Sequence, residues 1–294
     1  MTDGAELTGV LPVDKPEGPT SHDIVARARR ALGTRRIGHT GTLDPFASGL
    51  LLLCLGRATR LAEYLTGLDK TYQARARLGT VTDTDDRMGA VLAASEGWRD
   101  LDDARVEEAL RGLEGPQLQV PPAYSAKKVD GERMYRRARR GETVVLPPVA
   151  VRVQRIEVLG LNLPDVDFEV ECSSGTYIRA LARDLGERLG VGAHLTALRR
   201  TRIGAHELGT AVPAERLADT EAVRAAFLSP ADALAHLPHA EVSAAQAREI
   251  EHGGPILAPD GLPTDTPIVV VEAGDVVAIA ELASGMLRPR KVFR

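Results

Sequence analysis

The sequence predicts an α+β fold with a central mixed, mostly antiparallel sheet and a small β-rich module toward the C-terminus. Two observations carry this prediction. Strand-like and helix-like segments are interleaved along the 294 residues, and the clearest strands come as hairpins, which pair antiparallel. Hydrophobic residues make up 44% of the chain and aromatic residues only 3%, so the core must consist mainly of Leu, Val, Ala and Ile.

The first half of the chain holds two predicted helices and one apolar run. Residues 23–32 follow a Thr-Ser pair and keep apolar residues on one face, which predicts a capped helix. Residues 103–113 have helical spacing and stop before a Gly-Pro pair. The run LLLLCL over 50–55 is too short to cross a membrane. It fits either a buried strand or the first turns of a buried helix.

The second half begins with the clearest hairpin. Residues 149–161 and 166–172 alternate apolar and polar side chains around the turn sequence NLPD, and residues 177–189 have helical spacing. Two prolines near 230–238 indicate a boundary, so we divide the chain into domains over 1–235 and 236–294. Beyond that boundary we predict one helix and three short strands, over 243–252, 267–272, 276–282 and 288–292.

Several classes of protein are disfavoured by composition. The two cysteines, Cys54 and Cys172, are too few for a disulfide framework and fit a reducing compartment. The first residues have neither a basic head nor an apolar segment, so no signal peptide is expected. No apolar stretch reaches 18 residues, so no transmembrane helix is expected. These features predict a cytoplasmic protein.

The net charge of −4 by itself argues against a nucleic-acid-binding protein, but the distribution of charge argues for one. Residues 127–140 carry +5 net, and further basic clusters lie at 27–36 and 199–202. A single charged run is most often a solvated helix face, whereas three clusters favour a polyanion-binding surface. The basic residues of the first run are Lys127, Lys128, Arg133, Arg136, Arg137, Arg139 and Arg140.

Residues 38–56, GHTGTLDPFASGLLLLCLG, are the most informative stretch of the chain. They set a lone carboxylate, Asp44, in a turn rich in Gly, Thr and Pro, directly before the apolar run. Such turns let a ligand approach the backbone closely, and a carboxylate at the rim of an apolar core suits a nucleophile or general base. Aspartate before an apolar run is also a common cap, so the residues alone leave both interpretations open.

Metal chemistry finds little support in the sequence. The seven histidines, among them His39, are scattered without ligand spacing, and the two cysteines lie far apart. The stretch TDTDD over 82–86 raises a rival hypothesis, a magnesium-dependent phosphoryl-transfer enzyme, but the chain lacks a G-x-x-x-x-G-K-[ST] loop. We interpret TDTDD as a turn with side-chain-to-backbone hydrogen bonds. No metal is therefore expected.

Six blocks of sequence, in order and within about the first two-thirds of the chain, resemble the motifs of the TruB family of tRNA pseudouridine synthases. The active-site block is GHTGTLDPFASGLL, which begins at Gly38. Six ordered blocks are far more specific than any single short pattern. The other five are VDKPEGPTSHDIV (13–25), DKTYQARARLGTVTDTDD (69–86), VPPAYSAKKVDGERMYRRARRGE (120–142), CSSGTYIRALARDLG (172–186) and HLTALRRTRIG (194–204).

The resemblance implies roles for individual residues. Asp44 becomes the catalytic carboxylate, Tyr72 the stacking partner of the flipped base and a candidate proton acceptor, and Arg179 the cation that holds Asp44. An RNA-gripping insertion is implied over about 118–148, with the basic run described above. Further contacts with the RNA backbone come from Arg199 and Arg200. The implied substrate-binding residues are His39, Tyr72, Tyr177, Leu198 and Lys15.

The resemblance also implies a fold and a reaction. The fold is that of pseudouridine synthases over 1–235, with a PUA-like RNA-binding domain over 236–294. The reaction is isomerisation of uridine 55 in the T-loop of tRNA by base flipping and an aspartate-dependent rearrangement of the glycosidic bond, and it needs no cofactor. The implied partner is the T-arm stem-loop, bound by a monomer with no obligate protein partner.

Some alternatives stay open at the level of sequence. One is a guide-dependent relative that acts on ribosomal RNA, and another is an RNA-folding module in which catalysis is secondary. The role of Asp44 is equally open: it could attack C1′, attack C6 or assist a proton loss.

Overall fold

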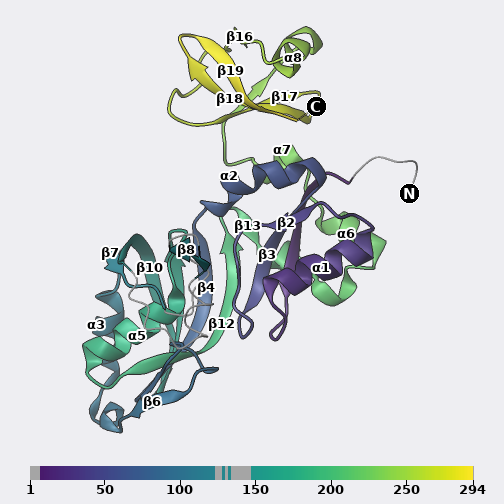
Figure 1. The fold of residues 1–294 in the computed structure, drawn as a ribbon. Coiled ribbons are helices and arrows are strands. Elements are labelled where there is room, and N and C mark those ends of the chain that lie inside the picture. The colour runs from purple at the N-terminus through teal and green to yellow at the C-terminus, as the bar shows by residue number, and fades with distance from the viewer. Residues whose placement is uncertain (1–6, 123–127, 130–131, 134–146, 294) are drawn as a thin grey trace.

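The computed structural model describes residues 7–122, 128–129, 132–133 and 147–293. Within them one ten-stranded sheet dominates, in the order β14-β1-β3-β12-β4-β11-β10-β7, with β2 paired to β3 and β13 to β12 (Figure 1). Its strands are β1 (Gly9–Lys15), β2 (Ile37–His39), β3 (Ser48–Leu55), β4 (Lys70–Leu78), β7 (Gly115–Gln119), β10 (Val149–Asn162), β11 (Asp165–Cys172), β12 (Ala193–Ile203), β13 (His206–Glu207) and β14 (Val212–Pro213).

The pairing in this sheet is mixed and mostly antiparallel, as the sequence predicts. Only β1 with β14 and β12 with β3 run parallel. The hairpin of β10 and β11 closes at the expected turn, where Asn162 pairs with Asp165. The apolar run 50–55 belongs to β3, so the strand interpretation is confirmed. Strand β3 is buried on both faces, which explains why its leucines are consecutive rather than alternating.

Helices cover both faces of the half of the sheet that contains β1 and β3. On one face, α1 (Ser21–Leu32) and α6 (Thr220–Ala226) form one apolar cluster with Leu51, Leu53 and other residues of those strands. Thr20 and Asp23 cap α1 reciprocally, which explains why the helix begins two residues before the predicted start. On the other face, η1 (Gly56–Leu61) and α2 (Ala62–Thr66) pack against Leu50 and Leu52.

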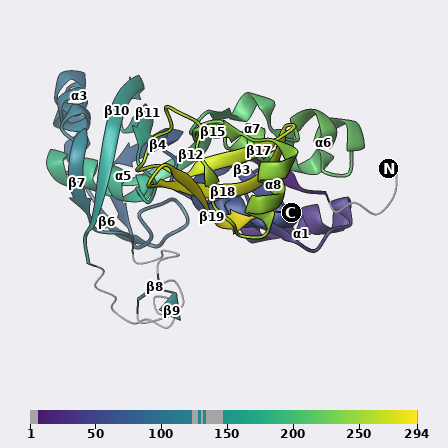
Figure 2. The ribbon, with the colours of Figure 1, turned by 90° about the horizontal axis from the view of Figure 1, so that it is seen from above.

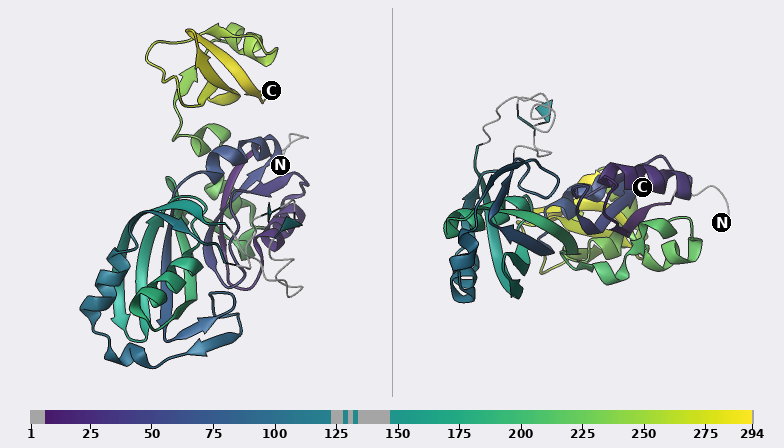
Figure 3. Two further views of the ribbon diagram at one scale, coloured as in Figure 1. Left: turned by 60° about the vertical axis from the view of Figure 1, so that its left-hand side comes forward. Right: turned by 90° about the horizontal axis from the view of Figure 1, so that it is seen from below.

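The other half of the sheet is covered on one face by two helices, α3 (Asp103–Arg111) and α5 (Ile178–Leu189) (Figure 3). Strand β4 alternates buried and exposed residues from Tyr72 onward, so its polar residues face away from those helices. The two halves meet where β12 runs beside β3. That contact is only two residue pairs long, Arg199 with Ser48 and Arg200 with Gly49.

The C-terminal segment forms a separate five-stranded sheet, in the order β15-β17-β18-β19-β16, flanked by α8 (Ala244–Glu251) (Figure 1). Three of its strands match the predicted ones, namely β17 (Ile268–Glu272), β18 (Asp275–Ala283) and β19 (Met286–Val292). The short edge strands were not predicted, because two or three residues carry no periodicity. They are β15 (His239–Glu241) and β16 (Ile256–Leu257).

This second sheet contacts the segment that follows β3. Arg57 and Arg60 donate hydrogen bonds to the carbonyl oxygens of Phe293 (2.6 Å) and Val292 (2.5 Å). Val269, Val271 and other side chains of the second sheet share one apolar cluster with Leu50 and Leu52 of β3. The C-terminal module therefore packs against η1, which directly follows the strand that leads out of the Asp44 turn.

The remaining elements are short. The pair β8 and β9 lies apart from the main sheet (Figure 2), and most of the basic run 127–140 around it is outside the described residues. In the described part of the chain, no helix is long and apolar enough to cross a membrane. The short elements are β5 (Thr80–Thr82), β6 (Val91–Ala94), η2 (Gly97–Asp100), β8 (Lys128–Val129), β9 (Glu132–Arg133), η3 (Leu208–Thr210), η4 (Ala214–Arg216) and α7 (Pro230–Ala233).

Candidate active site

Asp44 lies in the loop between β2 and β3, and several surrounding elements hold that loop. From α1, Ser21 Oγ accepts a hydrogen bond from Leu43 N at 2.8 Å. From the end of β1, Lys15 Nζ donates to the Ala47 carbonyl at 2.7 Å. These bonds fix the loop backbone at Leu43, directly before Asp44, and at Ala47, three residues after it. A side chain on such a supported loop is preorganised rather than free to swing.

Arg179, in the first turn of α5, binds the Asp44 carboxylate with two nitrogens. Arg179 Nε lies 3.0 Å from Asp44 Oδ2, and Nη2 lies 3.3 Å from Oδ1. The Arg179 side chain is only 5% exposed, while that of Asp44 is 35% exposed and opens into the cavity. Planar two-point pairing of this kind fixes the direction of the carboxylate as well as its charge.

A second carboxylate, Asp86, holds the same guanidinium from the other side. Its Oδ2 lies 3.5 Å from Arg179 Nη1, which also donates to the Thr84 carbonyl at 2.9 Å. Asp86 Oδ1 in turn accepts bonds from Met88 N and Thr84 Oγ1. The predicted turn with side-chain-to-backbone bonds is therefore present, but the prediction missed that one of its aspartates orients Arg179.

The electrostatics of Asp44 combine two opposing effects. Removal from bulk water raises the pKa of its carboxyl group above the ordinary value, and the nearby Asp86 acts in the same direction. The positive charge and hydrogen bonds of Arg179 oppose this rise. The result is a poorly hydrated carboxylate whose main partner is one fixed cation, a setting that suits a nucleophile or general base.

Asp44 faces a cavity of about 420 Å³. Three of the residues predicted to bind substrate, Tyr72, Tyr177 and Leu198, line it from β4, the start of α5 and β12. Tyr72 is 7% exposed, and burial raises the pKa of its hydroxyl. The complete lining is Thr40, Gly41, Thr42, Leu43, Asp44, Thr66, Lys70, Tyr72, Ser174, Gly175, Thr176, Tyr177, Ile178, Arg179, Leu198 and Arg200.

Two cations in this lining were not predicted to be there. Lys70 lies two residues before Tyr72 on β4 and donates to the carbonyls of Thr66 (3.0 Å) and Leu68 (2.5 Å). Burial lowers its pKa to about 8. Arg200, expected on the RNA-binding surface, is instead 1% exposed. The period of two along a strand could have placed Lys70 beside Tyr72, whereas no local pattern marks Arg200 as buried.

Other predicted site residues lie outside the cavity lining. Lys15 is completely buried and bonded to the carbonyls of Pro16 and Ala47, so it supports the loop and does not face solvent. Burial lowers its pKa to about 8. His39 is half-buried at the end of β2, where its Nδ1 accepts from Gly41 N at 3.3 Å. Arg199 is partly exposed and pairs with Asp14 at 2.8 Å.

The predicted RNA-gripping residues are only partly within the described structure. Lys128 and Arg133 lie on the paired strands β8 and β9. The others lie outside the described residues and stay a prediction, namely Lys127, Arg136, Arg137, Arg139 and Arg140.

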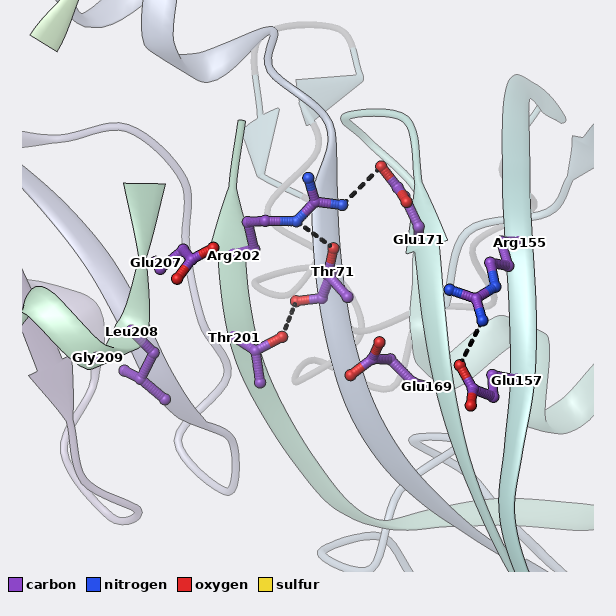
Figure 4. A pocket seen from close by; sticks show the side chains of 10 residues that line it. All are labelled: Thr71, Arg155, Glu157, Glu169, Glu171, Thr201, Arg202, Glu207, Leu208 and Gly209. Atoms are coloured by element: carbon purple, nitrogen blue, oxygen red, sulfur yellow. Dashed lines mark hydrogen bonds and ion pairs between the residues drawn. The ribbon is translucent and has the colours of Figure 1, made fainter. Parts of the chain in front are cut away.

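A second cavity of about 320 Å³ lies on the opposite side of β4, around Thr71 (Figure 4). Four of its charged groups form ion pairs: Arg202 of β12 with Glu171 of β11 at 2.7 Å, and Arg155 with Glu157, both on β10, at 2.6 Å. All four of these side chains are between 33% and 66% exposed. The groove is therefore open to solvent, and its ion pairs are hydrated. None of these pairs holds a carboxylate against a buried cation, as Arg179 holds Asp44. Elsewhere too, no three His, Cys, Asp or Glu side chains of the described residues converge in a metal-binding arrangement.

Comparison with known families agrees with this geometry. A model for the TruB family pseudouridylate synthase N-terminal domain matches residues 29–178, and one for the tRNA pseudouridylate synthase B C-terminal domain matches residues 179–235. The chain belongs to the TruB family of pseudouridine synthases. The two matched segments meet at Arg179, so both contribute to the carboxylate–guanidinium pair described above.

Individual members of the TruB family match this chain over nearly its whole length. The tRNA pseudouridine synthase B of Thermobifida fusca (strain YX) is 47% identical over 97% of this chain and 98% of its own. That of Paenarthrobacter aurescens (strain TC1) is 44% identical over 98% of this chain and 95% of its own.

Solved structures of related proteins confirm the fold class. A chain in the structure of an H/ACA RNP bound to a substrate RNA containing 2′-deoxyuridine superposes with a TM-score of 0.76 at 26% identity, covering 98% of this chain and 85% of that one. A chain in a Cbf5-Nop10-Gar1 complex gives the same TM-score at 27% identity and the same coverage. The predicted pseudouridine synthase fold is thus confirmed.

Proposed function

We propose that this TruB family enzyme isomerises uridine 55 in the T-loop of tRNA to pseudouridine. The observation that carries the proposal is the Asp44 carboxylate, held by two nitrogens of Arg179 at a cavity walled by Tyr72 and Leu198. The relatives named tRNA pseudouridine synthase B, at 44–47% identity, support tRNA as the substrate class. The motif resemblance supports position 55.

The proposed reaction is an isomerisation without redox change or hydrolysis. The N1–C1′ bond of the uridine breaks, the uracil rotates within the cavity, and a C5–C1′ bond forms. The hydrogen on C5 leaves as a proton, and N1 ends protonated, so the atoms balance. Asp44 is the group that reacts with the sugar or the base, and Arg179 keeps it ionised and aimed.

The cavity walls explain how a base could be held while it turns. A base removed from its stack costs a few kcal/mol, which stacking and hydrogen bonds must offset. Tyr72 offers a buried aromatic face, Leu198 an apolar wall, and Tyr177 closes the side formed by the start of α5. We assign these three residues to the flipped uracil, and His39 and Lys15 to support of the loop that carries Asp44.

We assign the grip on the RNA backbone to the basic run 127–140 and to Arg199, whose side chain is 41% exposed. Each lost phosphate contact should flatten the salt dependence of binding by about 0.7 to 0.9 in log–log slope. Replacing Arg136, Arg137, Arg139 and Arg140 by Gln should raise the tRNA dissociation constant. Filter binding over a range of KCl measures both effects. An unchanged slope would mean that the run is a solvated face.

We further assign the C-terminal sheet to a PUA-like RNA-binding domain that begins near residue 236, and the protein to a monomer in the cytoplasm. Both cysteines are buried free thiols, as a reducing compartment allows, and burial raises the pKa of each to about 12.

The direct test is tritium release from an unmodified tRNA transcript labelled at C5 of its uridines. The wild type should release about one equivalent per tRNA, and a transcript with cytidine in place of uridine 55 should release none. Release from both transcripts would refute the assignment to position 55.

A guide-dependent reaction is the second candidate, because the H/ACA RNP chains named above share this fold. The same assay addresses it, since the transcript is presented without guide RNA or partner proteins. An RNA-folding role is separable as well: the Asp44→Asn enzyme would then still refold a misfolded transcript at the wild-type rate.

A further inference from the structure

Arg200 is a fully buried arginine that the proposed chemistry does not use. It lies on β12 at the two-residue contact with β3, is 1% exposed, and lines the cavity that Asp44 faces. Arginine is almost never buried without specific partners, because an arginine side chain keeps its charge at any physiological pH.

The partners of Arg200 are the two ends of the loop that carries Asp44. Its Nε donates to the Leu50 carbonyl at 2.7 Å, and its Nη2 donates to the Gly41 carbonyl at 3.1 Å. Gly41 comes three residues before Asp44, and Leu50 six residues after it. One rigid fork therefore bridges both ends of the loop, a geometry that the single ammonium of a lysine cannot reproduce.

The backbone of Arg200 is fitted to the same loop. It pairs with Gly49, the first residue after Ser48 on β3, in the short parallel contact. A Cβ atom at position 49 would lie 2.2 Å from the Arg200 carbonyl oxygen, and φ of Gly49 is +105°. Only glycine allows this approach, so the distance between β12 and the loop is fixed by both the backbone and the side chain of Arg200.

The positive charge of Arg200 lies at the cavity wall, near the ring of Tyr72. Arg200 forms no ion pair with any carboxylate in the described part of the chain, since its partners there are carbonyls and Tyr72. Its Cζ lies 6.0 Å from the centre of the Tyr72 ring. Burying a guanidinium without a carboxylate partner costs free energy. The presence of Arg200 at this buried position therefore indicates a role for its hydrogen bonds, which an apolar residue could not make.

We propose that Arg200 is a positioning residue, which sets the place of Asp44 relative to Tyr72 by fastening both ends of the Asp44 loop to β12. The proposal rests on the proposed function in one respect: its test uses the tRNA substrate assigned above. Both hydrogen bonds of Arg200 to this loop are made to backbone carbonyls, and its side chain is 1% exposed, so we assign it to the cavity wall and not to the RNA-binding surface. Its loss should therefore slow the chemical step and leave RNA affinity intact.

The experiment compares single-turnover rates and tRNA dissociation constants for Arg200→Gln and Arg200→Lys. The control is Arg75→Gln, which removes an arginine on the neighbouring strand β4 from an exposed ion pair with Asp167. A misplacement of about 1 Å can slow catalysis roughly 100-fold, so we expect a loss of about that size for Arg200→Gln. Arg200→Lys keeps the charge but not the fork and should be intermediate. The control should stay within about twofold of wild type.

The split between rate and affinity decides the outcome, with folding checked by circular dichroism. A slow Arg200→Gln enzyme that binds tRNA within about twofold of wild type supports the proposal. A wild-type rate, or weakened binding at a wild-type rate, overturns it, because Arg200 is then a structural or RNA-contacting residue. If Arg200→Gln does not fold, the rate of Arg200→Lys decides in the same way. A wild-type enzyme that releases no tritium counts against the proposed function instead.

Discussion

The two faces of β4 hold the same kinds of groups in opposite settings. On one face Tyr72 lines the cavity with Asp44 and Arg179, and on the other Thr71 lines the groove with Arg202 and Glu171. The ion pair in the groove is the shorter of the two, 2.7 Å against 3.0 Å. Distance alone would therefore select the wrong face as the reactive one.

Burial of the cation is what separates the two pairs. The Arg179 side chain is 5% exposed and that of Arg202 is 39% exposed, whereas the two carboxylate side chains are about equally exposed, at 35% for Asp44 and 33% for Glu171. Two charges attract far more weakly in water than at a dry site, and exposed pairs contribute about 0–1 kcal/mol. The guanidinium in the cavity cannot exchange its carboxylate for water, as Arg202 can in the groove. The proposed reactivity of Asp44 thus depends on a cation that is shielded from water and not on the length of the ion pair.

The largest expected effect comes from Asp44→Asn, which changes only charge and nucleophilicity. We expect tritium release to fall below detection while tRNA still binds. The fold should survive, because Arg179 keeps Asp86 and the Thr84 carbonyl as partners. Turnover near the wild-type rate would show that the buried pair is no more reactive than the exposed one.

The next largest effect is expected from Arg179, and it is measured as a change in the pH dependence of the reaction rate. In the proposed reaction Asp44 acts as the carboxylate, so activity should be lost as the pH falls through its pKa, which burial raises. Arg179 opposes that rise, because an adjacent guanidinium favours the charged carboxylate. In Arg179→Gln the acid limb of the rate profile should therefore move to higher pH. An acid limb that does not move would mean that Arg179 does not control the charge of Asp44.

The elements around this site were partly predictable, because local patterns carry them, whereas the roles of its residues came from the resemblance to the TruB motifs. The glycine-rich turn before the apolar run marks the Asp44 loop, and the spacing after 177 marks the helix that bears Arg179. Strand β4 was not predicted, although its residues alternate from Tyr72 onward. Each of these signals is a property of neighbouring residues, and each corresponds to an element in the structure.

The rest could not be predicted, because it depends on contacts between distant segments. Arg199 and Arg200 are adjacent and chemically identical, yet one is partly exposed and the other 1% exposed. What decides between them is the two-residue pairing of β12 with β3, some 150 positions away. The hold of Asp86 on Arg179 is likewise a contact between a turn and a helix about 90 residues apart.

A smaller effect separates the neighbours Tyr72 and Thr71. Stacking of a base on an aromatic ring is worth about 1–3 kcal/mol, so Tyr72→Leu should lower kcat/KM by roughly 5- to 150-fold. Tyr72→Phe keeps the ring and should lose less. Thr71→Val, on the opposite face, removes an acceptor for Arg202 and should leave kcat/KM unchanged. Equal losses of kcat/KM in Tyr72→Leu and Thr71→Val would mean that activity depends on the integrity of β4 and not on which face a side chain occupies.

The smallest effect is expected in the groove itself. Glu171→Gln removes the carboxylate that pairs with Arg202 at 2.7 Å, but both side chains are about one-third exposed and exchange readily with water. Exposed pairs contribute about 0–1 kcal/mol, and salt screens them. Urea denaturation at low salt should show a loss within that range, and the difference from wild type should shrink at high salt. Tritium release should not change. A larger loss of stability would show that exposure does not weaken this ion pair. Any loss of turnover would show that the groove, and not only the cavity, takes part in the reaction.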